Sequence, residues 1–296
     1  MLGPLRGAFC AFSPHGAQPG CAEGAAGARA RRALPWPHRV ARVLVTAFRD
    51  GFAAVRAAGW RALALSLLSY TPVALAEAVP NVLLVVATFV LQVIVVLALI
   101  RLLGAHRPVP VPAPPQVDES GRRVLGPKQP GPPLTDADRS PVVALRNAFA
   151  LARTALRLTG LILLAQFAAI LTVIALSGGK VADYSENVLL LTALPVSALF
   201  LTFIAVAPQR VALEGETRVL VATAHSVRIA RQAYGPLLLI TVVEPAVTAA
   251  GSFGGVAGVA GAIAAAALLQ TWTTAAANEI YLAGPRLELP VPEPTT

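Results

Sequence analysis

Residues 82–103 read VLLVVATFVLQVIVVLALIRLL, and Gln92 is the one strongly polar side chain away from the ends of this run. A helix needs about 20 consecutive apolar residues to cross the ~30 Å hydrocarbon layer of a bilayer. The run has that length, and it lacks the regular polar positions of a helix on the surface of a soluble domain. It therefore predicts a transmembrane helix and a membrane fold.

Five further windows have a similar apolar character. Hydrophobic residues make up 56% of the 296-residue chain and charged residues 13%, whereas about a quarter of a typical soluble domain is charged. We therefore predict an all-α, polytopic membrane helix bundle with about six transmembrane helices. The further windows are Ala62–Val79, Leu158–Ser177, Val188–Ala207, the short Pro236–Ala250, and the Ala- and Gly-rich Val256–Thr274.

The distribution of basic residues predicts the orientation, because cytoplasmic loops are enriched in Lys and Arg. With six helices and a cytoplasmic N-terminus, Lys180 is the only one of 24 basic residues that lies outside. We expect a multi-pass protein of a bacterial cytoplasmic membrane with both termini in the cytoplasm. The net charge of +9 then reflects arginines beside anionic lipid headgroups and not binding of nucleic acid.

An arginine-rich segment occurs three times, each time before a pair of predicted spans. With Arg56, Arg153 and Arg231 in register, Phe52, Phe149 and Val227 coincide four residues earlier. The copies read RVLVTAFRDGFAAVRAAGWR (Arg42–Arg61), PVVALRNAFALARTALR (Pro141–Arg157) and RVLVATAHSVRIARQAYG (Arg218–Gly235). This repeat predicts three units of one amphipathic helix plus a transmembrane hairpin, over residues 40–103, 141–208 and 209–286.

The first copy has the pattern of a helix that lies in the membrane interface. Phe48, Phe52 and Val55 share one helical face, and arginines recur every seven residues on another. The apolar face would enter the acyl boundary while the arginines reach lipid phosphates. Two alternatives stay open, namely that the arginines only set the topology, or that each helix extends the span that follows. The candidate lipid-phosphate contacts are Arg49, Arg56, Arg146, Arg153 and Arg231.

Three stretches are predicted to be disordered: residues 1–39, the Pro-rich linker 104–140 and residues 287–296. These stretches are rich in Pro, Gly and Ala. They have too few large apolar residues to bury enough surface to offset the entropy of the chain. We interpret the linker as a spacer between hairpins, and a docking strip for a cytoplasmic partner is the alternative. Cys10 and Cys21 lie in the first stretch and have neither metal-ligand spacing nor a disulfide pattern.

Motifs of known chemistry are absent from the sequence. It has no phosphate-binding loop, no nucleophile elbow and no paired histidine ligands, so we expect no catalytic residue, no metal and no cofactor. The four histidines, His15, His38, His106 and His225, all lie outside the predicted spans. The glycines of Gly251–Gly261 recur at four-residue spacing, which favours close packing of membrane helices.

Glu244 is the one ionisable residue near the middle of a predicted span. A charged group there costs roughly 2.5 to 3.5 kcal/mol and usually faces the bundle interior or a water-filled cavity. Pro245 follows it, and Thr71–Pro72 has a similar place in the first unit. Two discontinuous helices could then face one another across an intramembrane polar site for a proton or a headgroup. The alternatives are a protonated glutamic acid that only packs, or a residue near the outer surface. Weaker polar candidates are Tyr70, Gln92, Gln270, Asn278 and Glu279.

Two segments carry a resemblance to known membrane proteins. The stretch ALRNAFALARTALRLTGLILLAQF (Ala144–Phe167) and the ending AAANEIYLAGPR (Ala275–Arg286) resemble uncharacterised actinobacterial six-helix integral membrane proteins. They also resemble the membrane domain that accompanies some glycerophosphodiester phosphodiesterases. The resemblance covers roughly Val40–Arg286. It implies a fold and a membrane location, and it carries no catalytic residue to this chain.

Three classes of function follow from these observations. The leading interpretation is a non-catalytic integral membrane protein that binds lipid or serves as a scaffold or accessory subunit of a membrane complex, with another membrane protein as a possible partner. The alternative is a small transporter or permease that uses Glu244–Pro245. A membrane-embedded enzyme ranks last.

Overall fold

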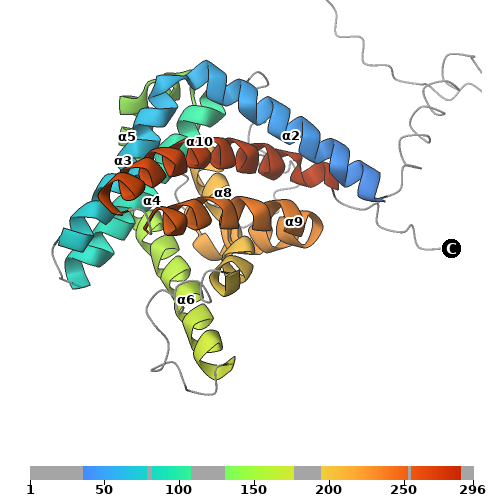
Figure 1. Cartoon of the computed structure of the whole chain (residues 1–296). Helices are drawn as coiled ribbons and strands as arrows, with labels where there is room; N and C mark the ends of the chain where they lie inside the picture. The colour runs from blue at the N-terminus through green and yellow to red at the C-terminus, as the bar shows by residue number, and fades with distance from the viewer. Residues whose placement is uncertain (1–35, 79–81, 108–130, 177–194, 253–254, 288–296) are drawn as a thin grey trace, which may run out of the picture. The chain divides into compact units, whose positions relative to one another are not determined.

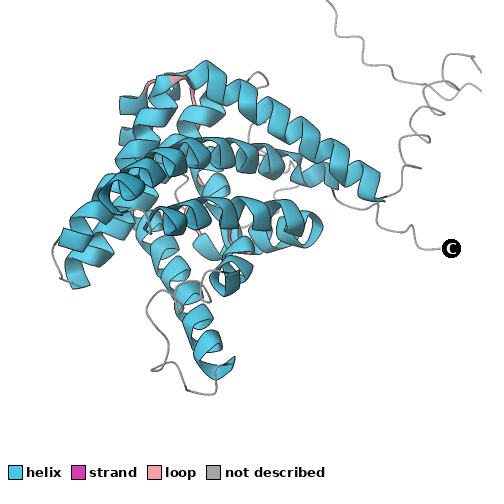
Figure 2. Ribbon diagram, viewed as in Figure 1, coloured by secondary structure: helices cyan, strands magenta, loops and turns pink. Residues whose placement is uncertain are grey.

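The computed structural model describes residues 36–78, 82–107, 131–176, 195–252 and 255–287. The chain divides into Met1–Ala41 and Arg42–Thr296, and the described part of the first unit is the beginning of one helix. Every secondary-structure element in the described residues is helical, as Figure 2 shows. The predicted all-α class is therefore confirmed for this part of the chain.

The described residues form ten helical segments in chain order. Their bounds are α2 (Trp36–Ala58), α3 (Trp60–Ala78), α4 (Val82–Ala105), the 3₁₀ helix η1 (Asp136–Arg139), α5 (Pro141–Phe149), α6 (Ala152–Leu176), a helix at Pro195–Thr202, α8 (Ala207–Glu214), α9 (Val219–Ser252) and α10 (Gly255–Leu287).

The C-terminal half of α4 lies at the centre of the second unit. Its side chains from Leu97 to Leu103 are all fully buried. The helix packs against α3, α5, α6, α8, α10 and η1, and Figure 1 shows it among α3, α5 and α6. Elements from all three predicted units therefore meet around one helix.

In the described residues, two helices are long and apolar enough to cross a membrane. They are Leu84–Ala105 and Ala152–Leu176, and the bent pair Pro195–Thr202 and Ala207–Glu214 would make a third. The two halves of that pair differ in direction by 43°. The predicted unit boundary at residues 208 and 209 falls inside α8, so α8 belongs structurally with the helix that precedes it.

The burial pattern reproduces the predicted repeat and its register. Four positions at i, i+4, i+7 and i+11 are buried in all three copies, so each copy has one inward face. These positions are Ala47, Gly51, Ala54 and Ala58 in the first copy, Ala144, Ala148, Leu151 and Ala155 in the second, and Ala222, Ser226, Ile229 and Ala233 in the third.

The buried face of α2 differs from the one that hydrophobicity predicts. Phe52 is 60% exposed, and small residues face the protein instead. A Cβ atom on Gly51 would lie 3.2 Å from the backbone of Ala275 in α10, and the Phe48 ring stacks on Trp272 with centroids 5.1 Å apart. The close backbone approach explains the difference, because only small side chains allow it.

Each copy bends where it enters the next helical segment. Gly59 separates α2 from α3 with a φ of 57°, which glycine adopts without strain. A turn at Ala150 and Leu151 separates α5 from α6, and Ala233 breaks the regularity of α9 with φ −125° and ψ 35°. The repeated helices therefore continue into the following segments at an angle.

Candidate functional site

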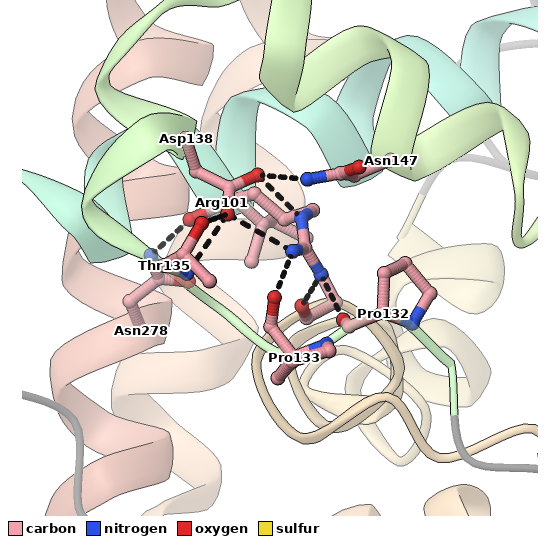
Figure 3. A network of polar contacts seen from close by, with 9 residues as sticks. Arg101, Pro132, Pro133, Thr135, Asp138, Asn147 and Asn278 are labelled. Carbon is pink, nitrogen blue, oxygen red and sulfur yellow. Dashed lines mark hydrogen bonds and ion pairs between the residues drawn. The ribbon is translucent and has the colours of Figure 1, made fainter.

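Arg101 lies near the end of α4 and is completely buried. A guanidinium group has five N–H donors and cannot lose its charge in a protein. All five donors have acceptors here, as Figure 3 shows. Nε and Nη2 donate to the two Asp138 carboxylate oxygens at 2.9 and 3.0 Å, Nη1 to the carbonyls of Pro132 and Ala212 at 2.8 Å each, and Nη2 also to the Pro133 carbonyl at 2.6 Å.

Asp138 supplies the negative charge of this pair from η1. Besides Arg101, its carboxylate accepts hydrogen bonds from the Thr135 backbone N–H at 2.9 Å and from the Asn147 amide at 3.0 Å. Burial alone would raise the pKa of Asp138, but the hydrogen bonds from Arg101, Thr135 and Asn147 hold that pKa below its ordinary value. The carboxylate is therefore ionised at neutral pH.

The same contacts order the end of the Pro-rich linker. Residues 131–135 are extended over α8, and the Gly131 N–H donates to the Gly215 carbonyl at 2.8 Å. Gly215 ends α8 in the left-handed region with a φ of 69°. The prediction of disorder over 104–140 is wrong for residues 104–107, which end α4, and for residues 131–140, because Arg101 binds two linker carbonyls and Asp138.

A second group of buried ionisable side chains connects α10 to α4 and α8. Arg107 pairs with Glu279, with 2.7 Å between Nη2 and Oε2. Tyr281 donates its hydroxyl hydrogen to Glu214, which also lies 3.3 Å from Arg210. Burial, and then the Glu214 carboxylate, raise the pKa of Tyr281, so the phenol keeps its proton. Asn278 and Glu279, weak candidates in the sequence, thus take part in helix packing.

The residues of the predicted polar site around Glu244 make contacts that differ from those expected. The Tyr70 hydroxyl of α3 donates to the Glu244 carboxylate of α9. Thr71 is exposed, so Tyr70 and not Thr71 is the residue that meets Glu244. The predicted discontinuous helices are not observed, because α3 continues helically through Pro72 and α9 through Pro245. The side chain of Pro72 lies outside the described residues.

Further polar contacts connect the same helices. Ser66 and Ser69 both donate to the Gln270 Oε1 atom of α10, at 2.6 and 2.7 Å. The Thr241 hydroxyl, three residues before Glu244, lies 3.1 Å from the Thr202 hydroxyl. Polar contacts therefore join α3, α9, α10 and the helix at 195–202 to one another.

All five predicted lipid-contact arginines lie on exposed faces. In the first copy Val45, Arg49, Phe52 and Arg56 recur at i, i+4, i+7 and i+11, and all four are exposed. The matching positions are Val142, Arg146, Phe149 and Arg153 in the second copy, and Leu220, Ala224, Val227 and Arg231 in the third. We call the first two sets the arginine–phenylalanine faces. They lie opposite the buried small-residue faces.

The described residues contain no cluster of three or more His, Cys, Asp or Glu side chains that could hold a metal ion. His106 Nδ1 lies 2.9 Å from the Leu102 carbonyl, and the His225 ring packs edge-on against Tyr281 with centroids 5.5 Å apart. Both histidines contact groups of the helix bundle.

Comparison with known proteins found no match for this chain among family models, curated proteins or solved structures. Function therefore has to be argued from the residues of the chain itself.

Sequence reasoning did not identify the Arg101–Asp138 pair. Arg101 was treated as the flank of an apolar run, and Asp138 lay in a segment predicted to be disordered. Two signals point to the pair: an arginine inside an apolar run needs an acceptor, and TDAD at residues 135–138 has the spacing of a capped helix start.

We predict that Asp138→Ala lowers the free energy of unfolding by about 3–5 kcal/mol, because it leaves Arg101 buried without a counter-charge. Unfolding in detergent measures the effect. The matched control is Asp136→Ala in the same 3₁₀ helix, whose side chain is 90% exposed and for which we expect a change within about 0.5 kcal/mol. Equal effects of the two changes would contradict this role.

The difference between wild type and Asp138→Ala also depends on pH. The folded-state pKa of Asp138 lies below its unfolded value, so the stabilisation is complete above the unfolded carboxyl pKa of about 3.9 and is lost as the pH falls through the lowered pKa.

Proposed function

We propose that this chain is a non-catalytic, multi-pass integral membrane protein with about six spans, and that its repeated helices bind anionic lipid at the cytoplasmic face. The two apolar helices and the bent pair support the membrane location. The proposal adds α3, α9 and α10 as spans, since they have 19, 34 and 33 residues and a span needs about 20. We also propose membership of the six-helix group that the sequence resembles.

The outer surface of α6 fits this arrangement. Leu164, Phe167 and Leu171 are 62%, 57% and 49% exposed, although each is large and apolar. A contiguous surface of this kind is unusual on a soluble protein and ordinary where lipid tails replace water. The bacterial cytoplasmic membrane with both termini inside is the placement that the basic residues favour.

The observation that carries the lipid proposal is the shared pattern of the arginine–phenylalanine faces. Each places two arginines seven residues apart on the same side as an exposed Phe and Val. An arginine fork matches the geometry of a phosphate group, and an aromatic ring beside it can enter the acyl boundary. An arginine that only sets topology needs neither neighbour, so the combination favours binding of lipid phosphate.

A cellular role as scaffold or accessory subunit is consistent with this chemistry. The arginine–phenylalanine faces would fix the repeated helices in the interface, and the buried small-residue faces hold the hairpins together. Another membrane protein is then the expected partner.

We predict the six-span topology to show in cysteine labelling of cells. In a variant with Cys10 and Cys21 changed to Ser, Asp183→Cys should react with an impermeant maleimide from outside and Arg122→Cys should react only after permeabilisation. The reverse pattern would overturn the threading. Labelling of both positions from outside would exclude a cytoplasmic linker.

We predict that replacing Arg49, Arg56, Arg146 and Arg153 together by Gln reduces the enrichment of anionic over zwitterionic lipid around the protein. Each basic residue near an anionic surface contributes about 1 kcal/mol, so the loss should be large and should shrink at high salt. Native mass spectrometry of nanodiscs with mixed lipids measures the enrichment.

The matched control replaces the same four residues by Lys, which keeps the charge but loses the planar fork. We expect it to retain most of the enrichment. Unchanged enrichment in the Gln variant would reject lipid binding by these faces and leave the arginines with a topological role.

A small transporter or permease is the second candidate, and the Tyr70–Glu244 contact favours it because a polar side chain of one helix binds the carboxyl group of another. This candidate predicts that Glu244→Gln abolishes substrate-dependent or proton-dependent flux in liposomes, with Thr248→Val as a control on the next turn of α9. Flux that survives Glu244→Gln would exclude it.

A further inference from the structure

We propose that Glu244 is a proton-binding site inside the membrane, where its carboxyl group carries a proton at neutral pH and keeps a hydrogen bond to Tyr70 when that proton passes to or from water. The inference rests on the proposed placement of α3 and α9 as spans. It holds whether the chain transports a substrate or only anchors lipid.

Glu244 differs from every other carboxyl side chain that the structure describes. The other six each form an ion pair with an arginine, so their negative charge is compensated. The pairs are Asp50 with Arg49, Asp136 with Arg139, Asp138 with Arg101, Glu214 with Arg210, Glu216 with Arg218, and Glu279 with Arg107. Glu244 contacts the neutral hydroxyl of Tyr70 instead.

Among the side chains that the structure describes, no basic group on the elements packed against Glu244 can take the place of an arginine partner. On α9 the closest arginine in sequence is Arg231, 13 residues or about 20 Å before Glu244 along the helix. On α3 the ionisable residues are Arg61, Tyr70 and Glu77, and Arg61 is nine residues before Tyr70. The elements that pack against α9 carry ionisable groups that form other contacts or lie at the start of a helix. These groups are Arg210 and Glu214 on α8, Glu279 and Tyr281 on α10, and Arg153 and Arg157 at the start of α6.

An ionised carboxylate without a counter-charge is expensive in an apolar interior, so the group is neutralised by a proton or by a metal cation. Metal cations of the Ca²⁺ type take six to eight oxygen ligands. Here the Ser66 and Ser69 hydroxyls of α3 are already bonded to Gln270, and among the described residues Tyr70 is the one side chain bonded to the carboxyl. The contacts therefore favour a proton over a metal ion.

The Tyr70 contact suits both protonation states. A phenol can donate to a carboxylate and can accept from a carboxylic acid, so the pair keeps one hydrogen bond when the proton leaves or returns. Between the two protonation states of Glu244, only the hydroxyl hydrogen of Tyr70 has to rotate. This property distinguishes the pair from an arginine–carboxylate pair, which has a fixed charge.

The hydrophobic reagent dicyclohexylcarbodiimide tests the proposal on the full chain in membranes. A protonated carboxyl adds across a C=N bond of the reagent: a new O–C bond forms, the proton passes to nitrogen, and the acyl group then shifts to nitrogen to give a stable acylurea. No oxidant or second reactant is needed. Peptide mass spectrometry locates the adduct, and Glu279 serves as the internal control because it is buried but paired with Arg107.

We expect adducts at Glu244 to exceed those at Glu279 by about tenfold or more, because the reagent adds to a protonated carboxyl and an arginine partner favours the carboxylate. The adduct at Glu244 should decrease as the pH rises and should not respond to Na⁺. Tyr70→Phe should shift the pH at which it decreases, and Glu244→Gln should remove it. Equal labelling of the two residues, or loss of the adduct with added Na⁺, would overturn the proposal.

A parallel reaction with a water-soluble carbodiimide distinguishes failure of the proton-binding proposal from failure of the proposed membrane placement. Modification of Glu244 by the water-soluble reagent would show that α9 faces water, which contradicts the proposed spans. Absence of reaction with both reagents would leave the spans in place and show an ionised or metal-bound Glu244, which contradicts the proton.

Discussion

Arg101 is a permanent positive charge at the most deeply buried point of α4, and the arrangement around it depends on its neutralisation. A buried charge that lacks its partner costs several kcal/mol. The compensation comes from Asp138, from two carbonyls of the extended segment before it, and from Ala212 near the end of α8, where helical carbonyls lack intrahelical partners. One side chain thus joins the first hairpin to the linker and to α8, which explains why segments far apart in sequence are ordered together.

The repeated helices pack against the protein with one face and present arginines on the opposite face. Small residues such as Gly51 and Ala148 are buried and allow close packing, as the approach of Gly51 to the α10 backbone shows. The opposite face carries arginine with an exposed Phe or Val. A helix that buried its Phe residues instead would keep its neighbours farther apart and leave arginines without an apolar anchor. The buried small-residue face recurs in all three copies and the exposed arginine–phenylalanine face in the first two, so close packing is a property of every unit.

The helical class, the repeat and its register were predictable from the sequence because they depend on local periodicity and composition. The identity of the buried face was not, since hydrophobicity ranks Phe52 above Gly51 whereas close approach of backbones favours the smaller residue. The contacts of the site could not be predicted from local sequence patterns, because they join residues far apart in the chain. Arg101 and Asp138 are separated by 37 residues, and Tyr70 and Glu244 by 174. Glu244 itself could be predicted as a polar candidate, because an acidic residue in the middle of an apolar run is costly. Its partner was placed one residue away, at Thr71.

The contrast between Asp138 and Glu244 follows from where arginine can be placed. The chain has 24 basic residues, and the same rule that keeps them at cytoplasmic helix ends makes an arginine in the middle of a span costly. Under the proposed topology, carboxyl groups near those ends, such as Asp138 and Glu279, therefore find arginine partners. A carboxyl group in the interior of a span has no such partner within reach. Under the proposed topology, the charge asymmetry that orients the protein leaves a proton as the means of neutralising Glu244, so orientation and protonation have one physical cause.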